Sequence, residues 1–183
     1  MKYINRWGLM RNTINENISE HSLETAFIAH ELALYRNVRF GGNVDPERAA
    51  LLAMYHDATE IITGDLPTPV KYYNAEIKAE YDKVEKMAEE KLLSYLPEDL
   101  RGYYAPLFSK TEEDKELWVL VKAADKLSAL IKCIEERQMG NSDFTEAEKS
   151  TLQAVHDMAL PEAEEFISEF LSAYHLTLDG QAK

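Results

Sequence analysis

The chain has 183 residues, enough for one domain with a substantial hydrophobic core, and its 45% hydrophobic content argues against disorder. Its formal charge of −13 excludes a nucleic-acid polymer as partner, because polyanions require a basic face. A small anionic substrate remains compatible, since it needs only a local positive centre such as a metal ion and one or two arginines.

The number of cysteines and the length of the apolar runs indicate the cellular compartment. The single cysteine, Cys133, permits no intramolecular disulfide, which fits a reducing environment. The longest apolar run is about seven residues, far short of the roughly 20 that span a bilayer. The N-terminal residues lack the apolar core of a signal peptide. We therefore expect a soluble, cytoplasmic protein that does not associate with membranes.

The composition favours helix throughout the chain, because only seven glycines and six prolines occur and alanine, leucine, glutamate and lysine dominate. The first predicted helix begins at Asn17, which can cap it, with Glu20 three residues later as in a capping box. Its apolar residues continue to Tyr35, and the glycines at 41–42 end it.

The second predicted helix has the clearest start. Asp45 is a suitable N-cap, and Pro46 suits the first helical position, where its missing N–H costs nothing. We expect this helix to run unbroken to Thr63, with Gly64 as its stop. Two prolines in the following segment, 65–69, fix φ there and predict a stiff loop.

The rest of the sequence also favours helix, and Thr68 is the expected N-cap of the next one. Long helices are predicted at about 68–95, 112–139, 146–158 and 162–174. Between the first two of these, the segment 97–108 predicts short helical pieces and loop. No stretch shows the period-two alternation of a strand. We therefore predict a single all-α domain over residues 1–183.

The strongest functional signal is the pair His56-Asp57, which ends an apolar run. A buried carboxylate needs a partner, because the loss of its hydration costs several kcal/mol. A divalent cation satisfies an imidazole and a carboxylate together. Glu60 lies about one turn further along the same predicted helix, so we expect it on the same face.

Two residues on other predicted helices strengthen this signal. His21 lies near the start of the first helix, and Asp125 is an acid within an apolar, alanine-rich stretch of the long helix. Two histidines and two aspartates from three helices would form a mixed nitrogen and oxygen site. Such a site leaves coordination positions open for water and substrate.

The order of these residues matches a known signature. His21, His56-Asp57 and Asp125 resemble the H…HD…D pattern of HD-domain metal-dependent phosphohydrolases. Four longer motifs narrow the likeness: residues 4–7, 19–22, 56–60 and 64–71. Together and in this order they resemble the bacterial 5′-deoxynucleotidases of YfbR type, over most of the chain up to about Gly140.

The resemblance implies an all-helical HD-domain bundle, a homodimer, and hydrolysis of deoxyribonucleoside 5′-monophosphates with a divalent metal ion such as cobalt or manganese. It implies four metal ligands: His21, His56, Asp57 and Asp125. HD proteins with two metals need further histidines between the HD pair and the last aspartate, and none occurs between Asp57 and Asp125 here, so we expect one metal ion. The family usually has a further helix before its Arg-Trp pair, whereas Arg6 is five residues from the start of this sequence.

The resemblance also assigns roles toward the nucleotide. Arg6 and Trp7 would contact it, with Arg6 as a catalytic residue on the phosphate, because the planar guanidinium binds phosphate through two donors. Glu60 would be the catalytic acid or base. Substrate contacts are further expected from three of the metal ligands and from the loop, namely His21, Asp57, Asp125, Asp65, Leu66, Pro67 and Thr68. Asp65 can accept from a sugar 3′-hydroxyl, while the tight loop excludes a 2′-hydroxyl.

Two other functions stay open at this point. One is an HD hydrolase that acts on another nucleotide phosphoester, such as a cyclic dinucleotide or a nucleoside triphosphate. The other is a helical module that binds a metal or nucleotide without turnover. The Arg-Trp pair and the loop at 64–69 favour the monophosphate. Glu60 beside a full ligand set argues against mere binding, which needs no such acid.

Overall fold

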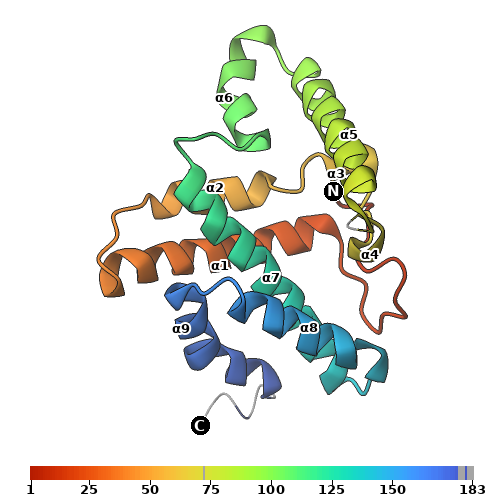
Figure 1. Cartoon of the computed structure of the whole chain (residues 1–183), viewed down its shortest axis with the longest axis vertical. Coiled ribbons are helices and arrows are strands. Elements are labelled where there is room, and N and C mark those ends of the chain that lie inside the picture. Colours follow the sequence, from red (N-terminus) through yellow and green to blue (C-terminus); the bar gives the residue numbers. More distant parts are fainter. Residues whose placement is uncertain (72, 177–179, 181–183) are drawn as a thin grey trace.

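The computed structural model describes residues 1–71, 73–176 and 180 of the chain (Figure 1). Across these residues helices are the regular secondary structure, with one isolated antiparallel bridge between Asn5 and Asn17. The predicted all-α fold is therefore confirmed. None of the described helices combines the length and the apolar character that crossing a membrane would require.

Three helices build the centre of the molecule: α1 (Ile18–Arg39), α2 (Pro46–Tyr55) and α7 (Lys115–Gln138). The first two lie side by side, and α7 crosses both of them (Figure 1). Burial of each large apolar side chain between them contributes about 1.5–3 kcal/mol. The fully buried core side chains include Ala29, Leu32, Leu52, Leu120 and Leu127.

The starts of α1 and α2 are as predicted. The Asn17 side chain accepts hydrogen bonds from the backbone N–H groups of Ser19 and Glu20, at 2.9 and 3.1 Å, and the Glu20 carboxylate accepts one from the Asn17 N–H. Asp45 accepts from the Arg48 N–H at 2.9 Å. These caps fix where the two helices begin and therefore where their later side chains point.

The prediction of one unbroken helix from Pro46 to Thr63 is wrong. The helix α2 ends at Tyr55, residues 56–59 form a turn, and a separate short α3 (Glu60–Thr63) follows. The reason is local, because His56 Nδ1 donates to the Ala53 carbonyl at 2.6 Å. That carbonyl would otherwise accept the next backbone bond of a continuing helix, so the ring competes with the helical ladder. The predicted stop at Gly64 is confirmed, with φ of 72°.

The third predicted helix is also interrupted. The chain forms a short α4 (Thr68–Lys71) and then a separate α5 (Ala75–Ser94). The long helix has its own N-cap, Asn74, which accepts from the Ile77 N–H at 2.8 Å. Thr68 therefore does not cap the long helix, and residues 65–71 stay beside the centre of the molecule.

The segment predicted as short pieces and loop is one helix, α6 (Glu98–Phe108). Its first turn carries Glu98 and Asp99, whose charges favour a helix N-terminus, and Pro106 lies only in its last turn. Helices α5 and α6 project together at the top of Figure 1. The two helices contact each other, α5 also contacts α3, and α6 also contacts α2.

The C-terminal part follows the prediction more closely. The helix α8 (Thr145–His156), preceded by the 3₁₀ turn η1 (Ser142–Phe144), packs along α7 (Figure 1). The last predicted helix is α9 (Pro161–Phe170), and its end is the 3₁₀ helix η2 (Leu171–His175).

The N-terminal loop that precedes α1 is tied to α7 by a buried ion pair. Lys132 Nζ lies 2.5 Å from Glu136 Oε1, and the two side chains are 5% and 1% exposed. The Glu136 carboxylate also accepts from the backbone N–H groups of Thr13 and Ile14, at 2.8 and 3.1 Å. This tether orders the loop against the helix that carries Asp125.

The tether predicts a pH dependence of stability. Burial alone raises the pKa of Glu136, but hydrogen bonds from Lys132, Asn141 and the backbone at 13–14 outweigh it and hold the pKa at about 2. The folded-state pKa is therefore lowered, so the stabilisation is complete above the unfolded value and is lost as the pH falls toward 2. The loss should amount to about 2–3 kcal/mol. Urea unfolding between pH 5 and pH 2 measures it.

A Glu136→Gln variant should be less stable than wild type at pH 5, and this difference should shrink as the pH falls. Glu90→Gln, which changes an exposed glutamate on α5, serves as the control and should follow wild type. A difference between Glu136→Gln and wild type that does not vary with pH would contradict the prediction.

Candidate active site and metal centre

Three side chains form a compact cluster where α1 and α2 lie side by side. His21 comes from the first turns of α1, His56 is the C-cap of α2, and Asp57 belongs to the turn that follows. Asp57 Oδ2 lies 3.5 Å from His21 Nε2 and 3.2 Å from His56 Nε2. One ligand atom from each residue lies within 4.8 Å of the others, which suits a single metal ion.

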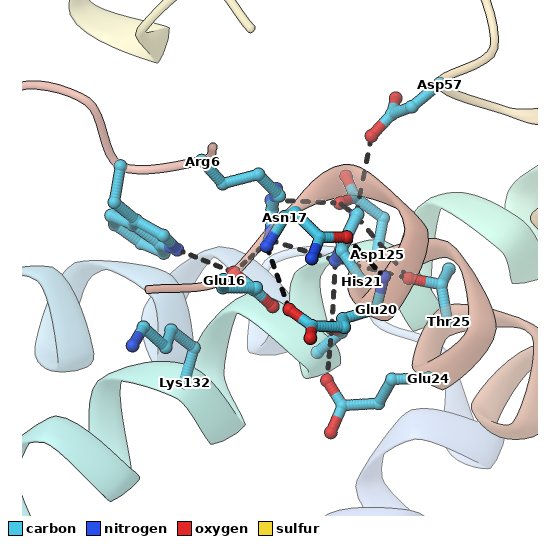
Figure 2. Close-up of polar contacts among 12 residues, drawn as sticks. Arg6, Glu16, Asn17, Glu20, His21, Glu24, Thr25, Asp57, Asp125 and Lys132 are labelled. Carbon is cyan, nitrogen blue, oxygen red and sulfur yellow. Dashed lines mark hydrogen bonds and ion pairs between the residues drawn. The ribbon is translucent and has the colours of Figure 1, made fainter. Parts of the chain in front are cut away.

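Asp125 reaches the same cluster from α7. Its Oδ1 lies 3.1 Å from His21 Nε2 (Figure 2) and 3.9 Å from His56 Nε2. The crossing of α7 over the first two helices places it there, although all of α5 and α6 lies between Asp57 and Asp125 in the sequence. The structure thus brings together the four residues that the sequence predicted as ligands.

The donor set fits a divalent cation. His56 Nδ1 donates to the Ala53 carbonyl, so Nε2 is the nitrogen that faces the cluster and would bind an ion there once it has lost its proton. That Nε2 is buried and has no hydrogen-bond partner within the described part of the chain. A buried polar atom without such a partner is rare in folded proteins. His56 is also the C-cap of α2, and the C-terminal end of a helix favours positive charge.

The electrostatics of the cluster favour a cation as well. Burial lowers the pKa of His56, but the charges of Asp57 and Asp125 outweigh it and raise the pKa to about 9. Burial raises the pKa of Asp125, yet its hydrogen bond to His21 and the charges around it hold that pKa far below its ordinary value. Burial and Arg6 lower the pKa of His21, so this imidazole is neutral near pH 7. The carboxylates thus keep their negative charge, which is what attracts a divalent ion.

Arg6 and Trp7 approach the cluster from the N-terminal loop. Arg6 Nη2 lies 3.8 Å from Asp125 Oδ1, and Figure 2 shows its guanidinium between Glu16 and the His21–Asp125 pair. Trp7 adopts φ of 60°, a strained value for a bulky residue that persists only where contacts hold it. Its ring packs against Phe144 at a centroid distance of 5.3 Å.

Glu16 holds both of these residues, and the sequence did not single it out. Its Oε2 accepts from Arg6 Nη1 at 3.0 Å and from Trp7 Nε1 at 3.2 Å. The Arg6 backbone N–H also donates to the Glu16 carbonyl at 2.9 Å. One carboxylate therefore orients the arginine and the indole together. No local signal distinguishes Glu16 among the 33 acidic residues of the chain.

A cavity of about 610 Å³ opens beside the cluster. Five of the predicted substrate residues line it besides Asp125: Arg6, Trp7, Asp65, Pro67 and Thr68. Leu66 is not among the lining residues, and neither are His21 and Asp57. Beyond Asp125, the part of the wall that α7 and α8 form was not predicted. It consists of Lys126 and Ala129 of α7 with Ala147, Ser150, Thr151 and Ala154 of α8.

Two further acids, Glu60 and Asp65, interact electrostatically with the cluster. Burial raises the pKa of Glu60, the first residue of α3, and the charges of Asp57 and Asp65 raise it further. Glu60 Oε2 is buried without a hydrogen-bond partner among the described residues. Burial raises the pKa of Asp65 too, opposed by Arg6 and by a hydrogen bond from the Trp7 backbone. Glu60 and Asp65 therefore share the electrostatic field of the cluster.

Solved structures define the class to which this fold corresponds. An HD-domain phosphohydrolase of Listeria innocua superposes with a TM-score of 0.75, at 21% identity, over 98% of this chain and 87% of that one. A cyanophage S-2L HD phosphohydrolase, whose structure holds dA and one catalytic zinc ion, superposes with a TM-score of 0.65, at 18% identity, over 95% and 92% of the two chains. At these identities the likeness shows the HD-domain phosphohydrolase fold.

Sequence comparison narrows the class to a family. The model of the 5′-deoxynucleotidase YfbR-like family matches residues 1–174. A 5′-deoxynucleotidase of Photobacterium profundum is 50% identical over 98% of this chain and 92% of its own. The 5′-deoxynucleotidase YfbR of an Escherichia coli strain is 49% identical over 98% and 90%. The chain therefore belongs to the YfbR-like 5′-deoxynucleotidase family, and the resemblance found in the sequence is confirmed.

The cluster predicts binding of one divalent ion per chain. In calorimetry, chelator-treated protein titrated with Mn²⁺ should bind a single ion, and Mn²⁺ at 100 times its Kd should raise the free energy of unfolding by about 2.7 kcal/mol. His56→Ala removes a predicted ligand and should weaken binding by at least about tenfold.

The control is His156→Ala, which changes an exposed histidine paired with Glu164 at 2.7 Å on the far end of α8. It should bind Mn²⁺ like wild type. If His56→Ala also bound like wild type, His56 would not be a ligand.

Proposed function

We propose that the chain hydrolyses deoxyribonucleoside 5′-monophosphates to deoxyribonucleoside and phosphate, with one divalent ion held by His21, His56, Asp57 and Asp125. The observation that carries the proposal is the position of this ligand cluster, beside a 610 Å³ cavity whose wall contains both Asp125 and Arg6. The family and its 5′-deoxynucleotidase relatives support the choice of substrate.

Arg6 is proposed to hold the phosphate. Its guanidinium lies within 3.8 Å of a proposed metal ligand, so a phosphate bound there would touch the arginine and the ion together. A planar fork of donors matches two phosphate oxygens, and it stabilises the charge that develops on them. Glu16 accepts only one of the Nη1 hydrogens and so leaves other donors for the substrate.

Glu60 is proposed to handle the proton. When bound, a divalent ion lowers the pKa of a coordinated water from about 15.7 to near 7 and so supplies a nucleophile at neutral pH. The Glu60 carboxyl is buried beside the charges of Asp57 and Asp65, with one oxygen lacking a hydrogen-bond partner among the described residues. That oxygen can orient the water or pass a proton to the leaving 5′-oxygen.

The loop that follows α3 is proposed to hold the sugar. Asp65, Pro67 and Thr68 line the cavity. The Trp7 backbone N–H fixes the Asp65 carboxylate, which can accept from a 3′-hydroxyl. The prolines stiffen the loop, so it cannot widen to admit a 2′-hydroxyl at low cost. Leu66 is proposed to support the loop and not to touch the substrate.

Further details of the proposal concern the ion, the assembly and the compartment. Cobalt or manganese suits a mixed histidine and carboxylate site. We also propose a homodimer and a cytoplasmic location. The arm formed by α5 and α6 supports the homodimer, because it exposes large apolar side chains, among them Met87, Tyr95 and Tyr103.

The substrate proposal predicts a selectivity profile. Phosphate release should be fast with deoxyribonucleoside 5′-monophosphates, and slow with ribonucleotides, triphosphates and cyclic dinucleotides. Asp65→Ala should lower the deoxy-to-ribo ratio of kcat/KM by about tenfold or more, because the contact that selects the sugar is lost. Asp125→Ala should abolish release with every substrate.

Faster turnover of triphosphates or cyclic dinucleotides would favour another phosphoester as the substrate. Metal binding without any phosphate release would favour a binding module. An unchanged deoxy-to-ribo ratio in Asp65→Ala would remove Asp65 from sugar recognition.

A second prediction concerns Glu60. Glu60→Ala should still bind nucleotide, with KM within about threefold of wild type, whereas kcat should fall by about 10²–10⁴-fold because a proton-transfer group is lost. Steady-state kinetics separate the two constants. Glu76→Ala, on the exposed first turn of α5, is the matched control and should keep the wild-type kcat. An unchanged kcat in Glu60→Ala would exclude a catalytic role.

A further inference from the structure

A chain of hydrogen bonds runs from the proposed metal centre to Glu24, a half-buried glutamate of α1 that contacts α7. His21 presents Nε2 to Asp125 and Asp57, while its other nitrogen, Nδ1, lies 3.0 Å from Ser128 Oγ of α7. The Ser128 hydroxyl in turn donates to Glu24 Oε2 at 2.5 Å. Figure 2 shows Glu24 on α1, about one turn after His21.

The direction of these bonds decides which nitrogen of His21 carries the proton. An ionised carboxylate only accepts, so the contact with Glu24 uses the single hydrogen of the Ser128 hydroxyl. Ser128 Oγ can then only accept from His21, which requires the proton on Nδ1. A neutral imidazole with Nδ1–H keeps its Nε2 lone pair, and that nitrogen faces Asp57 and Asp125.

A competing arrangement is present in the same site. Arg6 Nη1 lies 2.9 Å from His21 Nδ1, and an arginine can only donate. Were that bond to dominate, the imidazole proton would sit on Nε2 and block it as a metal ligand. Arg6 Nη1 has another acceptor, Glu16 Oε2 at 3.0 Å, so it can leave Nδ1 to Ser128.

We propose that Glu24, acting through Ser128, is a positioning residue that holds His21 in the Nδ1–H tautomer and so prepares its Nε2 to bind the metal ion. Glu24 touches neither the ion nor the substrate in this scheme. The inference rests on the proposed metal centre and deepens it, because it adds the residues behind one ligand. Partners of this kind fix the orientation of a ligating histidine and are typically worth about 10–100-fold in metal affinity.

Metal affinity and the tautomer itself test the relay, both without turnover. Calorimetric titration of the chelator-treated full chain with Mn²⁺ should show affinity about tenfold weaker in Glu24→Ala and in Ser128→Ala. The double variant should be no weaker than Ser128→Ala alone, because both changes break one chain. Glu24→Gln, whose amide oxygen still accepts, should recover most of the affinity.

The ¹⁵N chemical shifts of the His21 ring, recorded without metal, should show the Nδ1–H form in wild type and a shift toward Nε2–H in Glu24→Ala. Glu31→Ala, about two turns further along α1, is the matched control and should leave affinity and tautomer unchanged.

The outcomes separate the relay from the metal centre. If wild type binds Mn²⁺ but both single variants bind equally well, the relay is overturned and the metal centre stands. Additive losses in the double variant, or an unchanged tautomer in Glu24→Ala, also overturn it. If wild type binds no divalent ion, the metal centre itself fails. If Glu24→Ala does not fold, Ser128→Ala and Glu24→Gln supply the same comparison.

Discussion

Two carboxylates and two imidazoles lie against one another where α1, α2 and α7 meet, and this charged cluster constrains the rest of the structure. Any one of these groups would lose several kcal/mol of hydration energy if it were buried alone. Together they compensate one another, since the charges of Asp57 and Asp125 raise the pKa of His56, while the contacts with His21 and His56 lower the pKa of Asp125. The net charge of the four side chains is negative, and the guanidinium of Arg6 offsets part of this charge. A divalent ion completes the balance, which explains why one His56 nitrogen has no hydrogen bond of its own within the described residues.

The arginine that balances this charge does not come from the helical core. Arg6 lies on the N-terminal loop, so the position of its guanidinium depends on how firmly that loop is held. Glu16 fixes the guanidinium and the strained Trp7 with a single oxygen. Further along the loop, Glu136 and Lys132 clamp the backbone against α7, the helix that supplies Asp125. The N-terminal loop and the proposed ligand Asp125 are therefore both held by α7. This connects the stability of the fold to the position of Arg6, which is proposed to bind the phosphate.

The predictions succeeded where the physical cause is local in sequence. The caps of α1 and α2 depend on a side chain and a backbone N–H within three residues, so Asn17 and Asp45 could be identified directly. The joining of His21 and Asp125 to the His56-Asp57 pair was inferred from their residue types and supported by the resemblance to a family, because periodicity does not show which helices meet. Glu16 could not be found, since its role arises only when the loop folds back on itself. The cavity wall on α8 was missed for the same reason, because small residues such as Ala147 and Ser150 acquire meaning only through packing against α7.

The break after Tyr55 shows how a failed prediction and the site are connected. A continuous helix would place Asp57 about 100° round from His56 and would leave Glu60 near the face of His56. The chain instead uses the His56 ring to occupy the Ala53 carbonyl, which ends α2 and fixes the imidazole in the same act. Asp57 then lies in a turn, where its carboxylate can meet both histidines, and Glu60 starts a new helix within the field of Asp57 and Asp65. One hydrogen bond thus terminates a helix, selects the histidine nitrogen that faces the cluster and separates the proposed metal ligands from the proposed proton-transfer residue.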